Sequence, residues 1–112
     1  MMPPISRDLL IHDVDLNAVE KDKFGEETDR LIDHLYFVRI EPSNEVVVTN
    51  DNANVQCTGK MFVDSCNTIP VGVPIVVGNT VVWEGNRYRV RKVDQYFDNV
   101  RLHHTEVLLS DG

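Results

Sequence analysis

The chain has 112 residues, of which 42% are hydrophobic and 26% charged, and its net charge is −7. These values are typical of one folded domain and exclude a chain that is disordered throughout. The excess negative charge lies in residues 1–55, with twelve Asp or Glu against five Lys or Arg, whereas a surface that binds nucleic acid is normally basic.

The first 33 residues are predicted to form an extended, partly irregular arm. Pro3-Pro4 favours extended backbone at its start, and Leu9-Leu10-Ile11 is a short apolar patch suited to docking on a neighbour. Asp13 to Asp22 is acidic and only weakly periodic. We therefore divide the chain into an N-terminal arm over residues 1–33 and a β-barrel domain over residues 34–112.

Residues 26–41 fit both a helix and a strand. Leu31 and Leu35 are spaced as neighbours on one helical face. The run Tyr36-Phe37-Val38-Arg39-Ile40, however, is β-branched or aromatic apart from its arginine, which favours a strand. We predict a strand from about His34 and leave the structure of the preceding turn open.

Short strand-like runs and polar or Pro-rich connections alternate along the middle of the chain. Glu45 to Thr49 resembles a strand, and the polar run Asn50 to Asn54 predicts a loop. Val55 to Asp64 alternates loosely, with Gly59 as a site for a bend. Residues 65–76 contain two prolines and a glycine among apolar residues, which predicts a packed loop crossing the barrel.

The clearest element is a hairpin over residues 77–93. Gly85-Asn86 is a pair able to take the positive φ of a tight turn, and Val81 and Trp83 are two apart and share a face. After the turn, apolar and basic residues alternate as in a half-buried strand. The basic face consists of Arg87, Arg89 and Arg91.

A last strand is predicted over Arg101 to Leu109, after a turn at Asp94 to Asn99. Several short strands with turns between them predict an all-β fold. We expect a small antiparallel β-barrel with an extended N-terminal arm and long connecting loops, because a lone hairpin is at best marginally stable. The predicted core includes Val38, Ile40, Phe62, Val81, Trp83, Tyr88, Val90 and Val107.

No catalytic set and no metal site is recognisable. Adjacent strand residues point to opposite faces, so His103-His104 is interpreted as a pair of surface or interface histidines. Cys57 and Cys66 have eight residues between them and lack the close pairing of a zinc site. The N-terminus has no apolar signal region and no run is long enough to span a membrane, so we expect cytosolic synthesis with reduced thiols.

The three arginines are the strongest polar constellation. Alternate residues on a strand are about 6.5–7 Å apart, so three guanidinium groups would form a ridge on one face. Phosphates or carboxylates of a partner could match this ridge, which we assign to contacts with a partner or with a channel lumen. The alternative interpretation is a solvated outer face of the barrel.

Four groups of residues, taken in order, make the chain resemble a known family. They are Arg39-Ile40-Glu41-Pro42-Ser43; Met61-Phe62-Val63-Asp64 with Asn67-Thr68 and Pro70; Val77-Gly78-Asn79 with Trp83-Glu84-Gly85-Asn86-Arg87-Tyr88; and Leu102-His103-His104-Thr105-Glu106-Val107. The chain resembles the minor capsid proteins encoded by tailed phages and prophages of Gram-positive bacteria. These proteins are related to head-completion, or stopper, proteins of the head-to-tail connector.

The resemblance implies a structural virion protein that is not an enzyme and needs no cofactor. It implies a ring of copies, typically a dodecamer, at the capsid vertex. The portal or adaptor protein would lie on its head side and the tail or tail-terminator protein on its tail side. Such a ring closes the channel over the packaged DNA and docks the tail. The protein would be made in the host cytoplasm and would have no membrane partner.

The resemblance also implies a channel-closing loop, for which Glu45 to Gln56 is the best match. Its three valines favour a strand that could pair with the same segment of a neighbouring subunit. Its acidic tip would repel DNA phosphate. The alternative is an ordinary hairpin with a polar tip. The residues assigned to the loop are Val46, Val47, Val48, Asn50, Asp51, Asn52 and Asn54.

Two other functions are considered. A nucleic-acid-binding small barrel would use the arginines with Trp83 or Tyr88 as a platform. The overall charge argues against it, and so does the placement of Tyr88 on the face opposite the arginines. A tail terminator belongs to the same structural class as the stopper, and sequence separates the two poorly.

Overall fold

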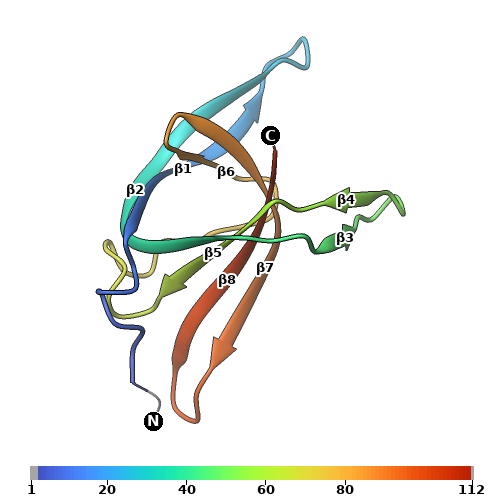
Figure 1. Cartoon of the computed structure of the whole chain (residues 1–112). Coiled ribbons are helices and arrows are strands. Elements are labelled where there is room, and N and C mark those ends of the chain that lie inside the picture. Colours follow the sequence, from blue (N-terminus) through green and yellow to red (C-terminus); the bar gives the residue numbers. More distant parts are fainter. Residues whose placement is uncertain (1–2, 112) are drawn as a thin grey trace.

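The structure, a computed structural model, describes residues 3–111. Figure 1 shows that these residues form strands and connecting loops. The strands are β1 (His12–Lys21), β2 (Glu27–Pro42), β3 (Val46–Val48), β4 (Asn54–Gln56), β5 (Gly59–Asp64), β6 (Thr80–Trp83), β7 (Asn86–Phe97) and β8 (Leu102–Asp111).

Six of the strands form a closed antiparallel barrel in the order β1-β2-β5-β8-β7-β6. The predicted all-β barrel is therefore confirmed. The strands β3 and β4 pair only with each other in a separate two-stranded sheet, which projects sideways from the barrel in Figure 1. This β3–β4 hairpin joins β2 to β5 and contains the residues assigned to channel closure.

The first strand of the barrel lies where the sequence predicted an irregular arm, and that prediction was wrong for residues 12–33. In β1, Val14 and Leu16 are buried, while Asp13 and Asp15, which alternate with them, lie on the outer face. This is an ordinary period-two pattern with carboxylates at the polar positions. The extended arm is therefore confined, among the described residues, to the stretch before β1, where Leu10 is buried and Ile11 exposed.

A tight turn joins β1 to β2. The strand β2 therefore begins at Glu27, upstream of the predicted start at His34. The side chain of Asp22 accepts hydrogen bonds from the backbone N–H of Phe24 (2.8 Å) and of Glu26 (3.0 Å). Gly25 adopts φ +82°, which a glycine takes without strain. Asp22 and Gly25 are thus the turn residues in a stretch that was predicted to be an irregular arm.

The barrel interior contains most of the predicted core. Val38, Val81, Val90 and Val107 are fully buried, and Ile40, Trp83 and Tyr88 are half-buried against them. Phe62 was predicted inside and lies outside. Three apolar residues follow one another at Met61-Phe62-Val63, so their order alone does not fix which face is buried. The pairing of Met61 with Val107 places Met61 inside and turns Phe62 outward.

The Pro-rich loop packs against the barrel as predicted. Ile69 and Tyr36 exchange two backbone hydrogen bonds of 2.7 and 3.0 Å, and Val73 and Ile75 pack against the core. The predicted turn at Asp94 to Asn99 begins too early, because β7 continues to Phe97. The side chain of Asp98 forms the actual turn by accepting from the backbone N–H of Val100 and Arg101 at 2.7 and 2.9 Å.

Candidate functional site

The β3–β4 hairpin brings together all the residues assigned to channel closure. Val46, Val47 and Val48 pair with Gln56, Val55 and Asn54 respectively. In the part of the chain that the structure describes, neither strand pairs with a third one on its other side. Both edges of this small sheet therefore offer unpaired backbone groups, whereas barrel closure removes such edges elsewhere.

The exposed valines are the second feature of the hairpin. The side chains of Val46 and Val48 lie on one face and are 55% and 63% exposed. A two-stranded hairpin with no covering layer is marginally stable in water, so this sheet gains little from packing within its own chain. Its surface is suited to packing and strand pairing in an assembly.

The tip of the hairpin is polar and negatively charged. Backbone hydrogen bonds join Thr49 N–H to Ala53 O (2.9 Å) and Asn52 N–H to Thr49 O (3.0 Å). Asn52 adopts φ +61°, a conformation that asparagine tolerates better than most residues. The Thr49 hydroxyl donates to Asp51 and lowers the pKa of that carboxyl, so the tip is ionised at neutral pH.

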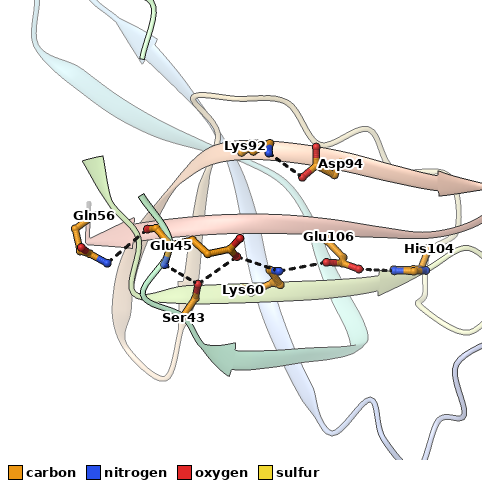
Figure 2. Close-up of polar contacts among 8 residues, drawn as sticks. All are labelled: Ser43, Glu45, Gln56, Lys60, Lys92, Asp94, His104 and Glu106. Atoms are coloured by element: carbon orange, nitrogen blue, oxygen red, sulfur yellow. Dashed lines mark hydrogen bonds and ion pairs between the residues drawn. The ribbon is translucent and has the colours of Figure 1, made fainter. Parts of the chain in front are cut away.

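A chain of ion pairs holds the base of the hairpin against the outer face of the barrel, as Figure 2 shows. The ammonium group of Lys60 lies 3.0 Å from a Glu45 carboxylate oxygen and 3.3 Å from one of Glu106. Glu106 is 2.8 Å from Nε2 of His104. The chain thus connects the residue preceding β3 to strands β5 and β8.

Backbone contacts reinforce this anchor. Cys57 N–H donates to Glu45 O (2.8 Å), and Ser43 N–H donates to Thr58 O (3.1 Å). The hydrogen bond with Lys60 lowers the pKa of Glu45, and the hydrogen bond with Glu45 raises that of Lys60. Both groups therefore remain charged over the physiological pH range, and the base is fixed while the strands project.

This chain of ion pairs leaves no recognisable pattern in the sequence. Its members are distant in sequence and meet only because β5 lies beside β8, where Lys60 and Glu106 share the outer face. The signal available was the polar position of Lys60 within an apolar strand. Without the strand order, nothing indicated which carboxylate it would meet.

The three arginines lie on the outer face of β7, alternating with the core residues Tyr88 and Val90, as predicted. Arg87 makes a bidentate contact with Asp29, with Nε and Nη2 at 2.8 and 3.0 Å from its oxygens. Arg89 contacts Glu27 with both terminal nitrogens at 3.3 Å. The third, Arg91, donates through Nε to the Ser110 hydroxyl at 2.8 Å.

These contacts pair the arginines with acidic residues of the first half of the same chain. The bidentate contact raises the pKa of Arg87 and lowers that of Asp29. A phosphate group would have to compete with carboxylates already in place, which weakens the case for a nucleic-acid surface here. Contacts of this ridge with a partner or lumen stay a prediction.

A separate cluster on β1 and β2 places His34 between two carboxylates. Its Nδ1 lies 2.6 Å from Asp15 and its Nε2 lies 2.7 Å from Asp13. The hydrogen bond with Asp15, followed by that with Asp13, raises the pKa of His34. The imidazolium form therefore ties the two strands together where β1 enters the barrel.

This cluster predicts a pH-dependent stability. Because the pKa of His34 is higher in the folded chain, its contribution is complete below the unfolded value of about 6.5 and is lost as the pH rises through the folded value. We expect His34→Gln to lose more stability, relative to the parent, at about pH 5.5 than at about pH 8.5. Urea unfolding at both pH values measures this difference. Equal losses would contradict the role of His34.

The adjacent histidines near the start of β8 lie side by side. The rings of His103 and His104 meet, with their Nδ1 atoms 2.8 Å apart, although opposite faces were expected. His103 lies near the start of β8 and turns toward the N-terminal arm, where its Nε2 is 2.6 Å from Pro3 O. Between residues 3 and 111 no three His, Cys, Asp or Glu side chains are grouped to hold a metal, and no helix could cross a membrane.

Of the comparisons with known proteins, one identifies a family. A family model described as minor capsid protein matches residues 6–109. No curated protein matches the chain. Among solved structures, the phage-like element PBSX protein xkdH from Bacillus subtilis is similar over 89% of this chain and 92% of that chain, with 16% identity and a TM-score of 0.42.

Proposed function

The chain belongs to the minor capsid protein family, and from this premise we propose that it is the stopper, or head-completion, subunit of a phage head-to-tail connector. Family membership makes it a virion-associated structural protein. In the proposed role, copies of the chain form a ring at the capsid vertex. The ring binds the portal or its adaptor on one side and the tail on the other.

The observation on which the proposal rests is the β3–β4 hairpin. It projects from a closed barrel, both of its edges are unpaired within the described chain, and two of its valines are exposed. In a ring, hairpins of neighbouring subunits would converge and pair edge to edge, which satisfies their backbone groups. The anionic tip at Asp51 would face DNA without adhering to phosphate.

The ion pairs at the hairpin base support the same role. A projecting segment that resists the pressure of packaged DNA needs a rigid attachment. The backbone hydrogen bonds of Glu45 and Ser43 supply one, and Lys60 adds to it by contacting Glu45 and Glu106 together. A ring also needs two different surfaces of each subunit to meet. In the proposed ring, the hairpin face and the outer barrel wall would be such a pair.

The direct test is deletion of residues 50–54 in the phage. We expect heads that assemble with the protein in place but lose DNA, because the converging tips are shortened. Virion protein content and retained DNA are measured together. If the mutant heads keep their genomes as the parent does, the channel is closed by another segment. The segment from Asn67 to Ile75 would then be the next candidate.

A milder pair of variants controls for effects on folding. Val46→Thr with Val48→Thr keeps β-branched side chains and removes apolar surface from the hairpin. Val76→Thr with Val77→Thr makes the same change at two valines of similar exposure outside the hairpin. Only the hairpin pair is expected to impair DNA retention. If both double variants impaired DNA retention equally, the hairpin valines would have no specific role in it.

A further inference from the structure

A cavity of about 250 Å³ lies at the end of the barrel next to the hairpin base. It is bounded by the β6–β7 hairpin on one side and by the ends of β2, β5 and β8 on the other. Apolar and aromatic side chains form its walls, and a carboxylate lies at its rim. Its lining includes Ile40, Thr58, Trp83, Tyr88, Leu109 and Asp111.

Two aromatic rings of the cavity are fixed by their neighbours. Trp83 and Tyr88 are both half-buried and pack against the core. The His12 ring meets the Trp83 ring edge-on, with centroids 4.8 Å apart at 72°. His12 is in turn held by a hydrogen bond from Ile40 N–H to its Nδ1 at 3.0 Å. The indole therefore presents a preorganised surface.

The charge of the cavity is negative. Asp111 lies opposite Tyr88 in the β7–β8 pairing, and one of its carboxylate oxygens accepts from the Thr58 hydroxyl at 3.3 Å. Glu41 also contributes to the lining, but its carboxylate accepts from Arg39 Nε at 2.9 Å. None of the lining residues is a lysine or an arginine. Asp111 is therefore the carboxylate best placed for a cation that enters the cavity.

We propose that this cavity binds an arginine side chain of a partner protein in the virion. A guanidinium group is planar, stacks on aromatic faces and donates two parallel hydrogen bonds to a carboxylate. The walls supply the aromatic faces, and the rim supplies the carboxylate. A neutral apolar side chain would shield the rim carboxylate from water and offer it no further hydrogen bond, which is unfavourable. The position beside the hairpin base fits contact with the next protein of the connector.

The proposal takes its partner class from the proposed function, but its chemistry is tested on the isolated chain. The probe is Nα-acetyl-arginine amide, which mimics an arginine within a polypeptide. Trp83 is the chain's only tryptophan, so its fluorescence and its indole N–H signal report on the cavity directly. We expect saturable changes with this probe and none with Nα-acetyl-norleucine amide, which has a shorter, uncharged alkyl side chain and no hydrogen-bond donor in it.

Variants locate the binding. Asp111→Asn and Tyr88→Leu should each weaken the affinity at least about fivefold, since each removes one favourable interaction with the guanidinium. Glu84→Gln removes a neighbouring carboxylate that does not line the cavity and should change nothing. Thermal unfolding shows whether each variant is folded. If Asp111→Asn or Tyr88→Leu fails to fold, the affinity of the other variant tests the proposal.

Free arginine is the third probe and distinguishes a protein partner from a small-molecule ligand. Its α-carboxylate would meet a cavity without a basic residue, so it should bind more weakly than the amide. Tighter binding of free arginine, equal binding of the norleucine amide or unchanged affinity in Asp111→Asn would overturn the proposal. Genome retention does not enter these measurements, so this result and that of the loop deletion are independent.

Discussion

Replacement of Asp64 by Ala is expected to lower the free energy of unfolding by about 3 kcal/mol, because several backbone donors lose their acceptor together. The side chain is 1% exposed. One oxygen accepts from Ile5 N–H at 2.8 Å, and the other accepts from Cys66 and Asn67 N–H at 2.9 and 2.8 Å. Asp64 thus joins the N-terminal arm to the turn that follows β5.

Asp22→Ala is the matched control for Asp64. Asp22 also accepts two backbone hydrogen bonds, but its turn is exposed and water replaces the lost acceptor. Its loss should cost about 1 kcal/mol, the ordinary value of a hydrogen bond exchanged with water. Chemical unfolding of both variants gives the comparison. Similar losses would show that Asp64 has no special structural role.

The second large effect is expected for Leu109→Ala. Leu109 is fully buried and pairs with Gly59 on one side and Val90 on the other. Removal of a buried leucine side chain leaves a cavity and typically costs about 2–5 kcal/mol. The paired Gly59 has no side chain that could move to fill the space, which places the expected loss in the upper part of this range.

Leu31→Ala provides the control, because Leu31 also lies in a barrel strand but is 57% exposed. Its expected loss is below about 0.5 kcal/mol, the ordinary range for surface substitutions. Urea midpoints of the two variants measure the difference. If Leu31→Ala lowered the free energy of unfolding as much as Leu109→Ala, the exposed face of β2 around Leu31 would have to be covered in solution.

Sequence patterns predicted the elements whose two faces differ clearly. In the segment from Val77 to Val93, valine and tyrosine alternate with arginine, and both the hairpin and its faces follow. Apolar and polar residues also alternate from Asp13 to Asn17. There, however, the polar residues are acidic, and no turn follows until after Lys21. Periodicity over five residues was too short to separate a strand from an irregular acidic segment.

The candidate site was predictable in part. The strand-forming valines and polar tip of residues 45–56 are local features, so the hairpin could be anticipated. The anchor could not, because Lys60 and Glu106 meet through strand order, which no local pattern fixes. The same reason explains why the arginine contacts with Glu27 and Asp29 were unforeseen: the partners are about 60 positions apart along the chain.

Barrel closure has a consequence for how the chain folds. β1 and β6 pair over three positions only, Asp15 with Val82, Leu16 with Val81 and Asn17 with Thr80. The intervening loop spans more than half the chain, so its closure entropy must be offset by this short contact. The β1–β2 and β6–β7–β8 units can form from local contacts, so we expect their joining to be the slow, late event. A newly made subunit would thus expose the core valines of the β1–β2 unit and of the β6–β7–β8 unit until the barrel closes.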